Sequence, residues 1–125
     1  MARVTGIGGV FLRSNDPKRL SAWYVEHLGM QPKEWGISFD WTDEVPPGTG
    51  TTAWSTFPED TTYFGEGAQR TMINYRVDDL NALLEELQAA GVTIDPKRDD
   101  SEYGKFAWIV DCDGNRVELW QPLPG

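Results

Sequence analysis

The sequence predicts an α+β fold made of two copies of one βαβββ module. Three observations support this prediction: a length of 125 residues, alternating strand-like and helix-like patterns, and a second half that repeats the first. At an offset of 63 residues an arginine, an aspartate and a leucine recur, as Arg13 and Arg76, Asp16 and Asp79, and Leu20 and Leu83. The chain is therefore expected to form a single domain over residues 1–125.

The first module is expected over residues 1–58. Pro17 after an Asn-Asp pair is typical of a helix start, and Gly29 is typical of a helix end. Alternating apolar residues then predict strands, the last of which ends at Pro58. The expected elements are a strand at 7–13, a helix at about 16–28, and strands at 35–41 and 51–57.

The second module is expected over residues 70–125, after a connector at 59–69. Asp79 is the expected helix cap, and four leucines at helical spacing follow it. Asp113-Gly114 predicts a tight hairpin turn. The expected elements are a strand at 71–77, a helix at about 79–90, a short segment at 92–94, and strands at 106–111 and 117–121.

Composition excludes several classes of function. Twenty acidic and 11 basic residues give a net charge of −9, which opposes binding to nucleic acid or to an anionic membrane. No apolar run is long enough to span a membrane. One cysteine, Cys112, permits no internal disulfide, so a cytoplasmic location is expected. One histidine, His27, excludes any site that needs two imidazoles from one chain.

Three segments of the chain resemble the vicinal oxygen chelate superfamily, which includes glyoxalases, bleomycin-resistance proteins and extradiol dioxygenases. They are Asp16-Pro17 with Ala22-Trp23-Tyr24 and Leu28-Gly29, then Tyr75-Arg76-Val77-Asp78-Asp79-Leu80, and finally Asp111 to Trp120. The resemblance implies that each module curls into a half-barrel sheet and that a pseudo-twofold pair of sheets encloses a cavity. It also implies a homodimer, because members of the superfamily often pair.

Enzymes of this superfamily hold a divalent metal with residues from the first and last strands of each module. The resemblance places these positions at Gly9, Trp54, Met72 and Glu118. Only Glu118 offers a ligand for a hard or borderline cation. A cavity with no metal cofactor is therefore expected, and a divalent metal is the alternative.

Glu118 is the candidate catalytic residue. Family geometry points it inward, where an unpaired charge is costly, and Arg13 or Arg76 is the expected partner. The alternative is a solvated surface carboxylate. His27, at the end of the first helix, is interpreted as a helix-end residue, and Cys112 as a small turn residue.

Aromatic residues divide between core and cavity. Phe11 is in phase with Gly9, and Trp54 lies on a metal-position strand, so both are expected to face the cavity. The same side chains alternatively fill that space and leave no room for a ligand. The candidate ligand-binding residues are Phe11, Arg13, Trp54, Met72, Asn74, Arg76, Trp108, Glu118 and Trp120.

Three functions remain open. The first is a small-molecule-binding protein that takes a flat apolar or cationic ligand in a metal-free cavity. The second is a lyase, isomerase or dioxygenase, either metal-dependent or using Glu118 as a base. The third is a partner-binding domain with a vestigial cavity.

Overall fold

The computed structural model describes residues 2–28, 30–40, 51–65, 68–112 and 114–123. They divide into two compact units: the first unit is residues 8–71, and the second unit is residues 1–7 together with 72–125. Trp41 and Asp113 lie outside the described residues, as does the side chain of His27.

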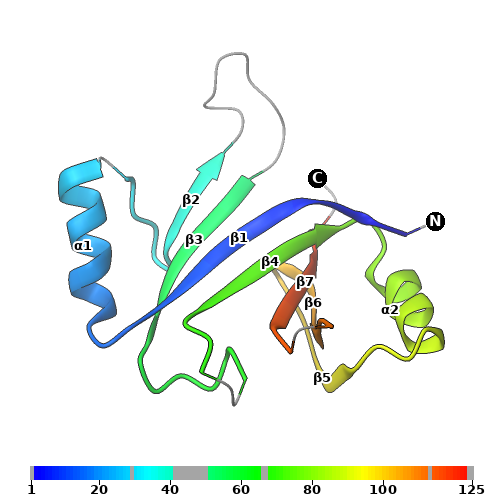
Figure 1. Cartoon of the computed structure of the whole chain (residues 1–125). Helices are drawn as coiled ribbons and strands as arrows, with labels where there is room; N and C mark the ends of the chain where they lie inside the picture. Colours follow the sequence, from blue (N-terminus) through cyan, green and yellow to red (C-terminus); the bar gives the residue numbers. More distant parts are fainter. Residues whose placement is uncertain (1, 29, 41–50, 66–67, 113, 124–125) are drawn as a thin grey trace. The chain divides into compact units, whose positions relative to one another are not determined.

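The first unit contains three strands and one helix within its described residues. They are β1 (Val4–Ser14, whose first residues belong to the second unit), α1 (Pro17–Leu28), β2 (Ile37–Asp40) and β3 (Thr51–Pro58). β3 pairs in parallel with β1 and antiparallel with β2, and α1 packs against β3 (Figure 1). Asp16 Oδ1 accepts a hydrogen bond from the Arg19 backbone N–H at 3.1 Å, which caps α1 as predicted.

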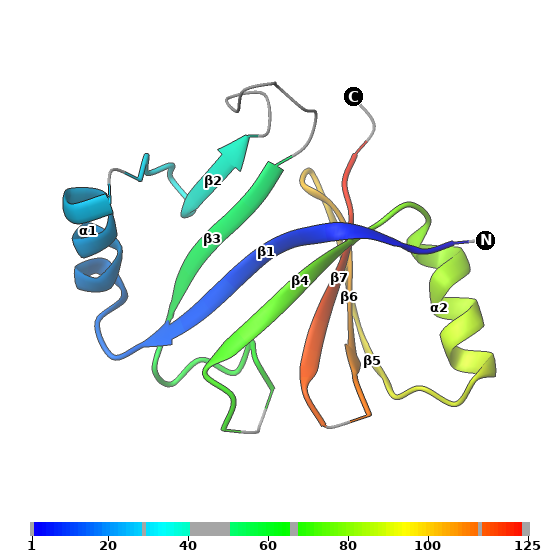
Figure 2. The same ribbon diagram turned by 45° about the horizontal axis from the view of Figure 1, so that its top comes forward.

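The second unit contains β4 (Thr71–Val77), α2 (Leu80–Ala89), β5 (Ile94–Ser101), β6 (Gly104–Val110) and β7 (Arg116–Gln121). The strands lie in the order β4-β7-β6-β5 (Figure 2). β4 and β7 are parallel, and the other two pairs are antiparallel. A core of Val77, Leu80, Ala107 and Leu119 lies under α2, which Asp79 caps through a 3.1 Å bond from the Ala82 N–H. The predicted strand–helix–strand order is confirmed in this half.

β5 corrects the expectation of only a short segment at residues 92–94. The structure has an eight-residue strand whose last six residues are exposed. It lies at the end of the strand order, where its outer edge has no neighbour among the described strands. Charged residues and a proline are usual at such edges because they discourage pairing with other chains. They also remove the apolar alternation by which a strand is recognised.

The connector expected at 59–69 packs onto the first unit over its described part. Phe64 is 1% exposed, and the rings of Phe57 and Tyr63 stack with centroids 5.1 Å apart. Arg70, which follows the segment, forms an ion pair with Glu59 at its start, with Nη2 2.9 Å from Oε2. This ion pair brings the two ends of the segment together. The segment thus supplies aromatic side chains to the sheet face.

Candidate functional site

The two parallel strand pairs share one register. Phe11 of β1 pairs with Ser55 of β3, and Asn74 of β4 pairs with Glu118 of β7. Each residue of the first pair lies 63 positions before its counterpart in the second. Directly paired residues project from the same face of a sheet, and so do residues two apart on one strand. This rule defines an equivalent face in each unit, opposite the face that the helix covers.

Trp54 lies on the other face, so the prediction that it shares a face with Phe11 is wrong. It pairs with Val10 of β1 and Ile37 of β2, and its ring lies 4.7 Å from that of Tyr24 in α1. The error is a one-residue slip, because equating Trp54 with Glu118 requires an offset of 64. A slip of one residue moves a side chain to the opposite face. Ser55 occupies the position equivalent to Glu118.

The face of the second unit buries a polar pair. Glu118 is 1% exposed and Asn74 is 3% exposed. Asn74 Nδ2 donates a hydrogen bond to Glu118 Oε2 at 2.7 Å. Asn74 Oδ1 is also buried and accepts no hydrogen bond from any described residue. Met72 and Trp108, each 1% exposed, lie on the same face, so the pair has an apolar surround.

Cationic side chains stack on the two indoles of this face. Lys97 Nζ lies 5.3 Å and Arg116 Cζ 5.4 Å from the ring centroid of Trp108. Arg76 Cζ lies 5.5 Å from the ring centroid of Trp120. Desolvation by burial lowers the pKa of Arg76 from its usual value, but guanidinium stays protonated in proteins. Three cationic side chains of the second unit therefore lie against the indoles of this face.

The equivalent face of the first unit is aromatic. Phe11 and Phe57 have ring centroids 5.4 Å apart. The guanidinium of Arg13 lies over the ring of Phe64, at 5.4 Å from its centroid. Arg13 Nε and Nη2 are buried and find no hydrogen-bond acceptor among the described residues. The predicted pairing of Glu118 with Arg13 or Arg76 stays a prediction.

The four predicted metal positions do not fit a catalytic divalent metal. Gly9 has no donor, and a Cβ there would lie 2.9 Å from the Ala53 carbonyl oxygen. Trp54 is turned toward α1. Met72 and Glu118 bring one neutral thioether and one carboxylate. Throughout the described residues, no three His, Cys, Asp or Glu side chains form a group able to hold a metal ion.

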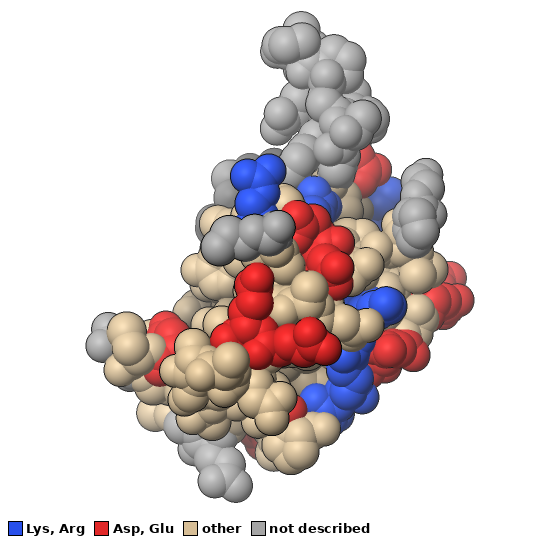
Figure 3. Space-filling model, turned by 90° about the vertical axis from the view of Figure 1, so that its right-hand side faces the viewer, with Lys and Arg blue, Asp and Glu red and all other residues tan. Residues whose placement is uncertain are grey.

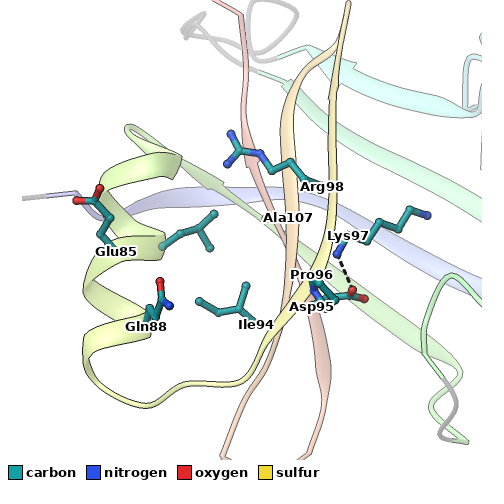
Figure 4. Close-up of a pocket in the computed structure, with 9 residues that line it drawn as sticks. Glu85, Gln88, Ile94, Asp95, Pro96, Lys97, Arg98 and Ala107 are labelled. Carbon is teal, nitrogen blue, oxygen red and sulfur yellow. Dashed lines mark hydrogen bonds between the residues drawn. The ribbon is translucent and has the colours of Figure 1, made fainter.

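Two of the surface pockets lie between a helix and the strand or loop beside it. One, of about 290 Å³ between α2 and β5, has Ile94 pointing toward the helix that carries Glu85 and Gln88 (Figure 4). Ala107 lines it, and Ala107 pairs with Leu119 rather than with Glu118. This pocket is thus separated by the sheet from the Asn74–Glu118 pair. The other pocket, of about 390 Å³, lies between α1 and residues 32–37.

The surface around α2 and β5 is acidic, as the sequence suggests. Glu85 and Glu86 of α2 and Asp99 and Asp100 of β5 are exposed. Figure 3 shows acidic side chains gathered on this side of the molecule. Of the helices in the described ranges, none is both long enough and apolar enough to cross a membrane.

Comparisons with known proteins assign the family. A model of the Glyoxalase/Bleomycin resistance protein/Dioxygenase superfamily matches residues 6–119. The chain belongs to this superfamily. The predicted resemblance and the glyoxalase-like α+β fold are thereby confirmed. No curated protein sequence matches the chain significantly.

Solved structures agree on the fold of the superfamily. Methylmalonyl-CoA epimerase from Mycobacterium tuberculosis is 24% identical, with a TM-score of 0.65 over 97% of this chain and 90% of that chain. A variant epimerase from Streptomyces coelicolor in complex with 2-nitronate-propionyl-CoA is 16% identical, with a TM-score of 0.72 over 98% and 100%. A superfamily member from Vibrio splendidus 12B01 is 17% identical, with a TM-score of 0.59 over 97% and 99%.

Proposed function

We propose that this chain is a small-molecule-binding protein and that Glu118 and Asn74 receive the cationic end of a flat ligand. The observation that carries the proposal is the buried Asn74 amide, which donates to Glu118 and leaves its own oxygen without a partner in the described residues. A buried acceptor without a hydrogen bond costs about 1–3 kcal/mol, and native proteins rarely leave one. A ligand N–H group satisfies this acceptor.

The neighbouring side chains support a flat ligand body. Trp108 pairs with Glu118 across β6 and β7, and Trp120 follows Glu118 on the same face. Indole rings offer broad apolar contact to a flat ligand body. Both acceptor oxygens and both rings come from one unit, so the proposed site needs only residues 72–125.

The proposal needs no metal. One carboxylate and one thioether are too few donors for a stable divalent site. The amide of Asn74 already holds one oxygen of Glu118, so the chain orients the carboxylate itself. Binding is therefore expected to survive treatment with a chelator.

A matched set of planar probes tests the proposal. Benzamidine, benzamide and benzoate share one shape but carry positive, neutral and negative head groups. In EDTA-treated protein, benzamidine is expected to raise the melting temperature more than benzamide, because a ligand stabilises the state that it binds. Glu118→Gln is expected to remove the benzamidine response.

Glu85→Gln is the matched control variant. It removes one exposed acidic charge from the same unit. Glu85 lies on the helix-covered side of the sheet, opposite the face that carries the buried pair. It is expected to keep the benzamidine response. A response that Glu118→Gln leaves unchanged, or no response at millimolar probe, contradicts the proposal.

A second candidate is an isomerase in which Glu118 is the general base. The observation that favours it is a buried carboxylate in a fold that this chain shares with methylmalonyl-CoA epimerases. Incubation with methylmalonyl-CoA in D₂O tests it, since a base that removes a carbon-bound proton introduces deuterium. Deuterium incorporation that Glu118→Gln abolishes supports the isomerase over the binding protein.

We also propose a cytoplasmic homodimer. The exposed free thiol of Cys112 is compatible with a reducing compartment. Sedimentation velocity at micromolar concentration tests the assembly. A single species at the mass of one chain contradicts the dimer.

A further inference from the structure

We propose that Arg13 in the first unit is a binding site for an organic oxyanion, a carboxylate or phosphate carried on an aromatic body. This site differs from the Asn74–Glu118 site in unit, in charge and in ligand class. It does not rest on the proposed function, because no residue is shared between the two.

The guanidinium of Arg13 is poorly satisfied by the chain. Nε and Nη2 are both buried and have no acceptor among the described residues. Arginine is always charged and has five N–H donors, so two buried donors without acceptors are a large desolvation penalty. Nε and one terminal nitrogen form the planar fork that binds the two oxygens of a carboxylate or phosphate.

The carboxylate of Glu59, on which the charge of Arg13 acts, is already engaged. Glu59 accepts two hydrogen bonds from the Arg70 guanidinium, at 2.5 Å and 2.9 Å. The Arg70 hydrogen bond is the largest reason that the pKa of Glu59 is lowered, and the charge of Arg13 adds only the smallest contribution. Glu59 thus neutralises Arg70 and leaves the Arg13 charge available.

Backbone contacts hold Arg13 in place. Its N–H donates to the Arg70 carbonyl oxygen at 2.7 Å, and its own carbonyl accepts from Arg70 Nη2 at 3.3 Å. The strand position of the residue is therefore fixed at both backbone groups. The residue as a whole stays partly exposed, which gives its side chain a route to solvent.

Aromatic rings surround the guanidinium and set the rest of the ligand class. Arg13 pairs with Phe57 across β1 and β3, and Phe11 precedes it on the same face. Tyr63 lies within ring contact of both phenylalanines, at 5.1 Å and 6.4 Å between centroids. The rings favour an aromatic anion over an inorganic one, because they contribute apolar contact.

Electrostatics makes the site selective. The cluster of Arg13, Arg70 and Glu59 carries one net positive charge on a protein of net charge −9. Most of the surface repels anions, so an anion that binds is directed to the few positive places. Affinity is expected to fall as salt is added, because mobile ions screen that attraction.

Benzoate and phenyl phosphate test the proposal. Each is titrated into ¹⁵N-labelled protein while the arginine Nε–H signals are followed by NMR. One Nε–H signal is expected to shift with saturation, and Arg13→Met is expected to lack that signal. Arg13→Lys keeps the charge but loses the fork, so binding is expected to weaken about tenfold or more. The probe that binds with the higher affinity shows whether the site prefers a carboxylate or a phosphate.

Two controls keep the result decisive. Arg19→Gln removes one positive charge from an exposed position in α1 and is expected to bind benzoate as the unchanged protein does. Arg13→Met, measured without anion, is expected to melt at the same or a higher temperature, because it removes the unsatisfied donors. A melting temperature several degrees lower shows that the chain satisfies Arg13 and overturns the proposal. An equal benzoate response in Arg13→Met and the unchanged protein overturns it too.

Discussion

The two units place equivalent strands in the same register but line the resulting face with different chemistry. The first unit has Gly9, Phe11, Arg13, Ser55 and Phe57 where the second has Met72, Asn74, Arg76, Glu118 and Trp120. In both units the guanidinium of the arginine lies over an aromatic ring, Arg13 over Phe64 and Arg76 over Trp120. Among the residues that the structure describes, the buried polar pair occurs only in the second unit. Backbone pairing therefore fixes where side chains lie, and the residues at those places decide the chemistry that each face offers.

Replacing Trp108 tests how far the face of the second unit depends on its buried indole. Trp108→Ala is expected to lower the free energy of unfolding by about 3–5 kcal/mol, because a large buried ring leaves a cavity. Trp35→Ala in the first unit, where Trp35 is 50% exposed, is expected to change it by about 0.5 kcal/mol. Urea denaturation measures both. Equal losses would mean that the two indoles do not differ in burial.

The equivalent positions Glu118 and Ser55 give the next comparison. Glu118→Gln is expected to lower the free energy of unfolding by about 3 kcal/mol, because it removes a buried carboxylate from the groups that it pairs with. Ser55→Ala is expected to cost about 1 kcal/mol or less. Thermal and urea unfolding check both values. A loss below about 0.5 kcal/mol for Glu118→Gln would exclude a buried ion pair.

A double-mutant cycle sharpens the assignment of Trp54. Tyr24→Ala and Trp54→Ala are expected to couple by about 0.5–1.5 kcal/mol, the range for aromatic pairs in contact. Phe11→Ala and Trp54→Ala are expected to be additive, because the two side chains lie on opposite faces of the sheet. Coupling between Phe11 and Trp54, without coupling to Tyr24, would restore the sequence-based expectation.

Two ion pairs, one in each unit, give the smallest expected effect. Asp95 has a lowered pKa, first because the Lys97 backbone N–H donates to it and next because Arg116 does. Asp95→Asn is expected to lower the free energy of unfolding by about 0.5–1 kcal/mol near neutral pH. Because the folded pKa lies below 3.8, the difference is complete above that value and disappears as the pH falls through the lowered pKa.

Glu59→Gln in the first unit is the matched test. Arg70 and Glu59 are 59% and 47% exposed, against 15% and 27% for Arg116 and Asp95. The loss for Glu59→Gln is therefore expected to be smaller and more easily screened by salt. Unfolding measured at low and high salt distinguishes the pairs. A larger loss at Glu59 would reverse the comparison.

Local signals explain why the helices were predictable. The caps Asp16 and Asp79 begin α1 and α2 within one residue of the expected starts. A capping side chain accepts a hydrogen bond from the first turn of its own helix, so it can be recognised in a short stretch of sequence. The 63-residue repeat likewise predicted which residues of β1 and β4 correspond.

The register of the last strands was not predictable from proline positions. Pro58 is the last residue of β3 and pairs with Ser14, whereas Pro122 follows the end of β7. The two prolines are 64 residues apart, so equating them matches Glu118 with Trp54 in place of Ser55. The strand β5 escaped prediction because an exposed edge strand has no apolar side to reveal it. The roles of Tyr63 and Phe64 depend on tertiary packing that no local pattern records, although three aromatic residues between 57 and 64 were a signal.

The division of the chain also has a consequence for its synthesis. Residues 1–7 are made before the first unit, but they belong with residues 72–125, where Arg3 and Asp78 exchange two hydrogen bonds. Gln121 ends β7, the last strand of this unit along the described chain, and its side chain accepts a hydrogen bond from the Leu80 N–H at the start of α2. The first unit can therefore order before β7 is made, whereas the second unit waits until β7 has been synthesised. Contacts between such distant residues close slowly, so the second unit is expected to limit the rate of folding.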